Sequence, residues 1–306
     1  MDVQDSRTVV NQSDAQPARF KQNLSGRYNQ DRVFQAAAWG ATAIAIIVLA
    51  WLLITILVDG LGTLDWQFIN EFPSRKPEQA GIKAALAGTV WLMFVVAAVS
   101  FPVGVGAGIY LEEFATDSWF TRLIDINISN LAGVPSIIYG LLGLAAFVRL
   151  IEPITGGRSV LSGGLTLALL ILPVIIVATR EALRSVPDSM RLAGFALGAT
   201  RWQVVWHHVL PMALPGILTG TILALSRAIG ETAPLIAIGA VTFIQSTPDS
   251  LHSPFTALPI QIYNWVGRPQ EEFHHIAASG IIVLMIVLLI MNAAAVILRN
   301  RFQKVR

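Results

Sequence analysis

Long apolar runs, separated by short polar segments, dominate the pattern of hydrophobic and polar positions along this chain. A helix needs about 20 mostly apolar residues to cross the roughly 30 Å of hydrocarbon in a bilayer. Five charge-free runs meet that length: Val33–Val58, Ala84–Leu111, Ile126–Val148, Ser159–Thr179 and Ile276–Leu298. Each is predicted to form one transmembrane helix.

A sixth span is less regular. The apolar run Val209–Ser226 is followed by Arg227 and Glu231, and then by a second apolar stretch too short to cross alone. Pro234 lies between the two stretches, and proline interrupts a helix because it has no N–H to donate. We therefore predict a helix from about Pro211 to Glu231, broken near Pro234, and an all-α membrane protein with six transmembrane helices.

Composition supports a membrane domain. Hydrophobic residues make up 54% of the 306 residues and charged residues only 13%, whereas a soluble domain carries about 25% charge. Residues 1–32 hold nine of the 40 charges. We expect residues 1–32 to be a polar tail and 33–306 a membrane domain.

The first apolar run is too long for a cleaved signal peptide. The net charge of +2 is small and the basic residues are scattered, which argues against nucleic-acid binding.

The distribution of Lys and Arg predicts the orientation of the spans. Segments on the side of the two termini and of the 180–208 loop carry 14 of these residues, and the opposite segments carry six. Basic residues accumulate on the cytoplasmic side of membrane proteins. Both termini and the 180–208 loop are therefore expected to be cytoplasmic.

The segment between the fourth and fifth spans predicts a short protruding helix. Pro187 ends the preceding helix, Asp188 or Ser189 is placed to cap the next one, and Gly198 is placed to end it in a left-handed conformation. Such a helix fits a groove on a soluble protein. An equally good interpretation is an interfacial helix that lies on the lipid headgroups.

The ionisable residues inside the fifth span are candidates for function. Arg227 and Glu231 lie four residues apart and share one helix face. A charge at the centre of a span costs about 2.5–3.5 kcal/mol, so such residues are retained for a reason. Either Arg227 attracts an oxyanion along a translocation path while Glu231 orients it, or the two form a buried structural pair.

Polar residues of the third span allow two interpretations. Asn130 and Tyr139 either line a hydrated cavity or make interhelical hydrogen bonds, which contribute about 0.6 kcal/mol each on average; we favour the second. The small residues of Gly104–Gly108, and Gly216 with Gly220, predict close helix packing rather than a nucleotide loop, because no strand precedes them.

The chain lacks the sequence motifs of several kinds of catalytic, nucleotide-binding and metal sites. The chain has no Gly-x-x-x-x-Gly-Lys-Ser/Thr, no His-Glu-x-x-His, no Gly-x-Ser-x-Gly and no cysteine. The segment 271–275 contains Glu-x-x-His in two overlapping registers, but a di-metal site needs the motif on two separate helices. We expect no catalytic constellation, no metal site and no cofactor bound by this chain.

The 181–211 loop resembles the EAA loop of binding-protein-dependent ABC importer permeases. Ala193, Gly198, Leu210 and Pro211 match the motif, while Leu192 stands where Glu is usual, Gly194 where the second Ala stands, and His208 where Ile stands. The resemblance implies a coupling helix between helices 4 and 5. It also implies that a partner ATPase is contacted by a set of residues: Arg191, Leu192, Ala193, Gly194, Gly198, Leu210 and Pro211.

Two further segments, Asn130–Gly143 and Arg227–Pro234, resemble the phosphate-specific transport permeases, and the similarity covers about Ala84–Leu298. This implies a type I ABC importer permease fold (MetI-like) and phosphate import across the plasma membrane of a prokaryote. Alternatives are another oxyanion (sulfate, molybdate or phosphonate), or a secondary transporter or channel. The implied partners are a PstC-like permease chain, two ATPase subunits that bind ATP and Mg, and an extracytoplasmic phosphate-binding protein.

Overall fold

The computed structural model describes residues 24–241 and 243–303, and every regular element in that part of the chain is helical. The α-helices are α1 (Leu24–Leu61), α2 (Trp66–Asn70), α3 (Lys83–Ile109), α4 (Trp119–Leu131), α5 (Ser136–Gly143), α6 (Glu152–Thr155), α7 (Val160–Arg184), α8 (Asp188–Ala196), α9 (Arg201–Val204), α10 (Leu210–Gly230), α11 (Ala233–Ile238), α12 (Leu258–Val266) and α13 (Glu271–Gln303). A 3-10 turn, η1 (Pro77–Gln79), and three π-helical turns, η2 (Tyr110–Phe114), η3 (Leu144–Leu150) and η4 (Val205–Val209), complete the set.

The span count agrees with an all-α membrane protein. Over the described residues, five helices are long and apolar enough to cross a bilayer, and six if the bent pair α4–α5 counts as one span. Helix α1 begins at Leu24, ahead of the predicted start at Val33, so residues 24–32 are helical. The remainder of the predicted tail, 1–23, lies outside the described residues. The chain divides into a unit that ends at Ile54 and one that begins at Thr55, and all of the predicted site residues belong to the second unit.

Helix α7 is the centre of this second unit, and small residues bring α3 and α10 close to it. A Cβ atom on Gly108 of α3 would lie 2.7 Å from Cβ of Thr179, and one on Gly216 of α10 would lie 2.9 Å from Cβ of Ala182. Those distances are shorter than any real carbon–carbon contact, so a larger residue would push the helices apart. This confirms the predicted close helix packing.

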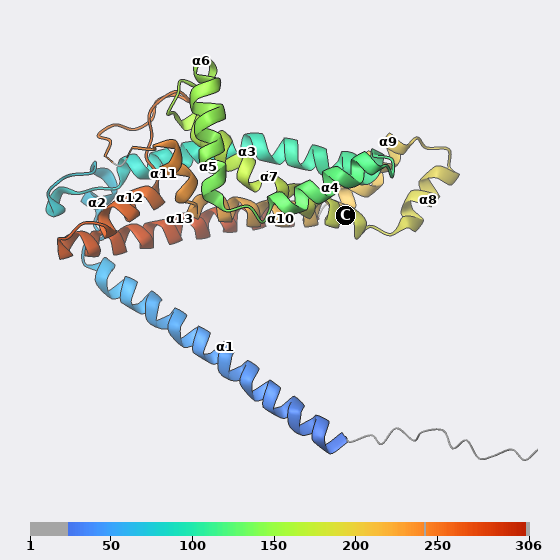
Figure 1. The fold of residues 1–306 in the computed structure, drawn as a ribbon, viewed down its shortest axis with the longest axis horizontal. Coiled ribbons are helices and arrows are strands. Elements are labelled where there is room, and N and C mark those ends of the chain that lie inside the picture. The colour runs from blue at the N-terminus through green and yellow to red at the C-terminus, as the bar shows by residue number, and fades with distance from the viewer. Residues whose placement is uncertain (1–23, 242, 304–306) are drawn as a thin grey trace, which may run out of the picture. The chain divides into compact units, whose positions relative to one another are not determined.

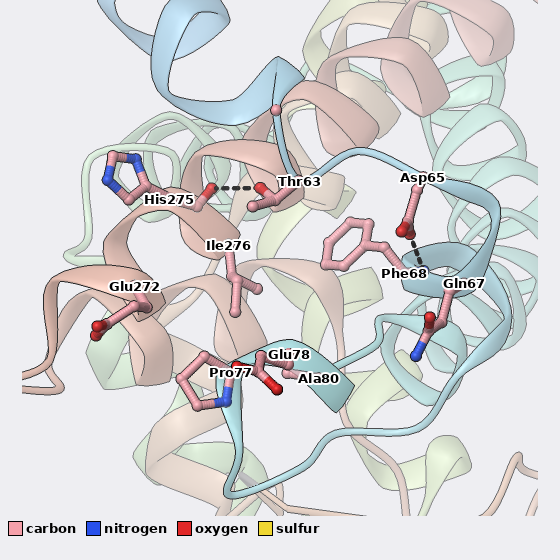
Figure 2. A pocket seen from close by; sticks show the side chains of 11 residues that line it. Thr63, Asp65, Gln67, Phe68, Pro77, Glu78, Ala80, Glu272, His275 and Ile276 are labelled. Carbon is pink, nitrogen blue, oxygen red and sulfur yellow. Dashed lines mark hydrogen bonds between the residues drawn. The ribbon is translucent and has the colours of Figure 1, made fainter.

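The two ends of this unit differ in character. In Figure 1, α8 lies at one end, and α2 and α12 lie at the opposite end. At the α2 end, Phe68, Trp265 and Phe273 form a compact aromatic core. Beside that core is a pocket whose lining includes Asp65, Glu78, Glu272 and His275 (Figure 2). The unit therefore presents a short helix at one end and an acidic pocket at the other.

Candidate functional site

The predicted break after the fifth span is present. Helix α10 ends at Gly230, Glu231 has an extended backbone (φ −74°, ψ 120°), and α11 starts at Ala233 with Pro234 in its first turn. Proline fits the first turn of a helix but not its interior. The chain therefore leaves α10 and restarts as α11, as the position of Pro234 predicts.

Arg227 and Glu231 meet at this break. Nε of Arg227 lies 3.2 Å from Oε1 of Glu231, as their four-residue spacing predicts. The Arg227 side chain is 49% exposed and that of Glu231 17% exposed. Within the described residues, no hydrogen bond engages the two Nη groups of Arg227. The guanidinium thus has Nη donors that no described residue uses.

The predicted span Ile126–Val148 is a bent pair of helices rather than one continuous helix. Helix α4 ends at Leu131, α5 starts at Ser136, and the two are bent by 106°. Pro135 caps α5, and a proline disfavours helical geometry at the preceding residue, here Val134. The turn across Gly133 and Pro135 therefore sets the bend, and the chain has two broken helices where the sequence pattern predicts one.

Tyr139 and Asn130, predicted from the polar groups of this region, lie on opposite sides of the bend. The Tyr139 ring is buried, and its hydroxyl donates a 2.8 Å hydrogen bond to the carbonyl oxygen of Leu131. Asn130 is exposed in the last turn of α4. Tyr139 thus fastens α5 to the end of α4, while the Asn130 side chain is accessible.

The two breaks pack against each other. Helix α5 lies on α11, and a Cβ on Gly140 would come within 2.6 Å of Cβ of Ala237 and 2.7 Å of Cα of Pro234. Gly140 is therefore a point of close approach between α5 and α11. It brings the bend that carries Tyr139 next to the helix that follows Glu231.

Helix α8 is the predicted short helix of the 180–208 loop. Gly198 follows it with φ +80°, as predicted for a left-handed helix end. The predicted side-chain cap is wrong: Pro187 occupies the cap position, and no side chain caps the helix. The carboxylate of Asp188 instead lies 3.2 Å from Nη1 of Arg191, so it forms an ion pair with another residue of the same helix.

The outer surface of α8 is apolar. Leu192 is 66% exposed and Leu197, in the turn after the helix, 89% exposed, and Phe195 and Ala193 are also exposed. Gly194 faces inward, where a Cβ would lie 2.7 Å from Val204. Leu210 and Pro211, the remaining residues of the EAA-like set, are half-buried at the start of α10.

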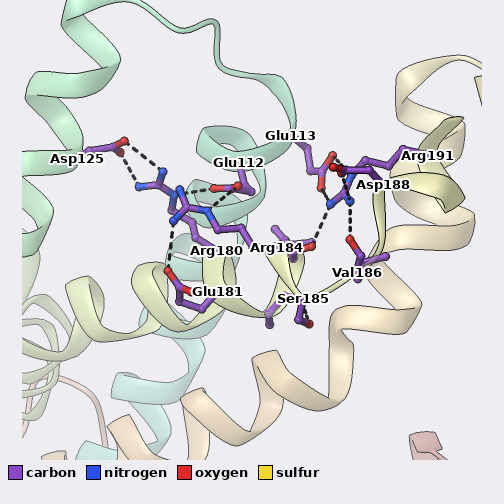
Figure 3. A network of polar contacts seen from close by, with 12 residues as sticks. Glu112, Glu113, Asp125, Arg180, Glu181, Arg184, Ser185, Val186, Asp188 and Arg191 are labelled. Atoms are coloured by element: carbon purple, nitrogen blue, oxygen red, sulfur yellow. Dashed lines mark hydrogen bonds and ion pairs between the residues drawn. The ribbon is translucent and has the colours of Figure 1, made fainter. Parts of the chain in front are cut away.

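Arg191 points inward from α8 (Figure 3). Its Nη2 lies 2.6 Å from Oε1 of Glu113, and its Nη groups also donate to the carbonyl oxygens of Val186 (2.8 Å) and Leu183 (2.9 Å). The hydrogen bond to Glu113 raises the pKa of Arg191 above its already high usual value. The guanidinium is therefore charged at every working pH, and Arg191 ties α8 to the end of α3.

A second group of charges lies beside this tie. Arg180 makes two parallel contacts with Asp125, of 2.6 and 3.1 Å, and a third of 3.1 Å with Glu112. Arg184 lies 2.8 Å from the other oxygen of Glu112. Sequence reasoning missed this cluster because it counts these residues only as loop charges. The available signal was their position: Glu112 and Arg180 directly follow apolar runs, and Asp125 directly precedes one.

No metal centre accompanies these residues. Over the described residues, no group of three or more His, Asp or Glu side chains is arranged to hold a metal ion. The arrangement is therefore one of helix breaks, a protruding apolar helix and an ion-pair cluster.

The chain is similar to known membrane permeases. It is 30% identical to the phosphate transport system permease protein PstA of Haemophilus influenzae, over 84% of this chain and 91% of that one. It is 33% identical to the probable ABC transporter permease protein YqgI of Bacillus subtilis, over 72% of this chain and 78% of that one. Both alignments cover most of each protein.

Solved structures share the fold. A bacterial alginate ABC transporter chain matches with a TM-score of 0.64 and 15% identity, over 89% of this chain and 95% of that one. A chain of the MetNI methionine ABC transporter, in an inward-facing conformation, matches with a TM-score of 0.55 and 21% identity, over 72% and 94%. These matches confirm the predicted MetI-like permease fold. Residues 100–304 match the family described as the binding-protein-dependent transport system inner membrane component, and the chain belongs to that family of multi-pass membrane proteins.

Proposed function

We propose that this chain is the permease subunit of an ATP-driven importer of inorganic phosphate. The observation that carries the proposal is the similarity to PstA, a phosphate transport system permease protein, over 84% of the chain. The half-exposed Arg227 at the helix break adds a cation with free donors, which suits an oxyanion.

In this proposal, Arg227 attracts phosphate, Glu231 orients the guanidinium, and Asn130 offers an exposed amide near the bend. Tyr139 acts indirectly, because its hydroxyl is already bonded to Leu131. A charge-assisted hydrogen bond is about twice as strong as a neutral one, so the guanidinium contributes most of the attraction.

In the same proposal, the ATPase that supplies the energy binds at the α8 end of the unit. The apolar surface of α8, with Leu192 and Leu197 outermost, docks into one of two partner ATPase subunits that bind ATP and Mg. Ala193, Gly198, Leu210 and Pro211 shape that contact, Gly194 lets α8 approach Val204, and Arg191 holds α8 to the membrane helices. Closure of the ATPase pair moves α8 and opens the path outward. The chain itself hydrolyses nothing.

The remaining partners belong to the same proposal. A PstC-like permease chain forms the other half of the path, and an extracytoplasmic phosphate-binding protein delivers the substrate at the α2 end. Both termini and α8 lie in the cytoplasm, in agreement with the excess of Lys and Arg on that side.

Uptake of radiolabelled phosphate by cells that lack only this chain tests the proposal. Sulfate and molybdate serve as parallel substrates, and wild type or Arg227→Gln serves for rescue. We expect loss of phosphate uptake alone, rescued by wild type and not by Arg227→Gln at equal protein level. Loss of sulfate or molybdate uptake instead would refute phosphate as the substrate. Unchanged uptake of all three oxyanions would refute the assignment as an importer.

A further inference from the structure

The six charged residues around the end of α3 connect four helices. Glu112 and Glu113 belong to the π-helical turn η2, Asp125 to α4, Arg180 and Arg184 to the end of α7, and Arg191 to α8. The adjacent carboxylates turn to different helices: Glu112 pairs with α7 and Glu113 pairs with α8 (Figure 3). The end of α3 is therefore bonded to α7 and α8 at once.

Burial distinguishes these contacts from ordinary surface ion pairs. The side chains of Glu113, Arg180, Arg191 and Glu112 are 6, 14, 17 and 17% exposed, and the more peripheral Asp125 and Arg184 are 32 and 50% exposed. Surface pairs contribute about 0–1 kcal/mol because water and salt screen them. Removal of one partner from a buried pair costs more, since a charge is left without compensation. The cluster therefore resists separation of the helices that it joins.

Asp125 is the one described contact between this cluster and α4. Both oxygens of its carboxylate accept from Arg180, at 2.6 and 3.1 Å, and this paired geometry restricts rotation as well as distance. Helix α4 continues through the bend into α5, which packs on α11 through Gly140. A continuous series of contacts thus runs from α8 through Glu113, Glu112, Arg180 and Asp125 to the two helix breaks.

We propose that this cluster transmits movement of α8 to α4. In this proposal Asp125 and Arg180 are positioning residues, because their contact makes the bend between α4 and α5 move when the coupling helix α8 moves. The proposal rests on the proposed function, because it assumes that an ATPase moves α8. It assigns a role to residues that touch neither the ATPase surface of α8 nor Arg227. A series of contacts does not by itself establish coupling between distant sites, so a measured coupling is needed.

The test uses the complete transporter, purified with its ATPase partner and reconstituted in liposomes. Asp125→Asn keeps the size of the side chain and removes its charge. We expect phosphate uptake to fall about tenfold, within the range typical of energetic coupling between sites, while ATP hydrolysis and complex assembly stay as in wild type. The matched control is Asp117→Asn, whose pair with Arg122 is exposed at 89 and 72% and which should leave both activities unchanged.

A second measurement follows the movement itself. The chain contains no cysteine, so spin labels at Ser129→Cys in α4 and Ala293→Cys in α13, both exposed positions, report one distance. We expect that distance to change between the nucleotide-free and the ATP-trapped state in wild type, and to stay constant in Asp125→Asn. Asp125→Glu, which retains the charge, should restore the change. If Asp125→Asn folds poorly, Arg180→Lys removes the paired contact while keeping the charge and should show the same loss.

The proposal is refuted if Asp125→Asn retains both phosphate uptake and the change in label distance. It is also refuted if this variant loses ATP hydrolysis together with uptake, because Asp125 would then act at the ATPase contact. Failure of the proposed function is separable. A wild-type transporter that changes the label distance with ATP but imports none of the three oxyanions refutes the substrate, while the distance in Asp125→Asn still decides the role of the cluster.

Discussion

The hydroxyl of Tyr139 donates a hydrogen bond to the main-chain carbonyl of Leu131, 2.8 Å away, across the bend between α4 and α5. The Leu131 carbonyl belongs to the last turn of α4, and it also accepts a 3.2 Å hydrogen bond from the amide of Val134. The side chain of Tyr139 therefore adds a second donor to this helix end and links two helices that are bent by 106°.

Removing that hydroxyl should loosen the bend. Tyr139→Phe keeps the ring but leaves the Leu131 carbonyl without this donor, so we expect the free energy of unfolding to fall by about 1 kcal/mol. The thermal unfolding midpoint in detergent measures the loss. Tyr110→Phe is the control, because the Tyr110 side chain is exposed. Equal midpoints for both variants would contradict a fastening role of Tyr139.

Gly140 should tolerate no side chain. Gly140→Ala places a Cβ 2.6 Å from Cβ of Ala237, and such overpacking costs about 1–3 kcal/mol. We expect a lower unfolding midpoint and reduced uptake, since α5 would separate from α11. Gly106→Ala provides the comparison, because a Cβ there meets nothing within 4 Å and a helical Gly→Ala change gains about 0.5–1 kcal/mol. A Gly140→Ala protein as stable as wild type would refute the close contact.

Leu192 should be needed for binding of the ATPase. Leu192→Asp introduces an unpaired charge on the exposed face of α8, and we expect affinity for the ATPase subunit to fall about thirtyfold, the roughly 2 kcal/mol of an interface hot spot. Leu192→Met keeps the apolar surface and should bind normally. Surface plasmon resonance with the purified ATPase gives both values; similar affinities for the Asp and Met variants would place the docking surface elsewhere.

Reversal of the Arg227–Glu231 pair separates its two interpretations. Arg227→Glu with Glu231→Arg preserves the attraction between the two positions but moves the cation into the break between α10 and α11. A purely structural pair should regain both protein level and uptake in the double variant. For a path role we expect normal protein level with phosphate uptake as low as in Arg227→Gln, measured by initial rates in cells.

Most of the membrane spans were predictable from the sequence, because an apolar run longer than 20 residues has few alternatives to a transmembrane helix. The end of α8 at Gly198 and the restart at Pro234 were also predictable, since each depends on one residue with restricted or unusual backbone geometry. The bend at Pro135 was missed. An apolar run on both sides of a proline is compatible with a kinked span as well as with two helices, and only packing of Gly140 on α11 decides between them.

The ion-pair cluster was beyond prediction for a different reason. Asp125 and Arg180 are 55 residues apart, and no local pattern states which charges at the ends of different spans will meet. The same holds for the inward direction of Arg191. Its place in an EAA-like motif favours a contact with the ATPase, whereas its partners in the structure are Glu113, Asp188 and two carbonyl groups.

The π-helical turn at Tyr110–Phe114 places a constraint on the length of this part of the chain. Its 2.8 Å bond from the amide of Ala115 to the carbonyl of Tyr110 spans five residues, one more than an α-helical bond. Deleting a single residue here would restore regular α-helix and rotate everything after it by about 100°. Glu112 could then no longer face Arg180 and Arg184 while Glu113 faces Arg191. Substitutions can adjust the strength of those contacts, but only insertions and deletions change their direction, so relatives that keep the arginines are expected to align across this turn without gaps.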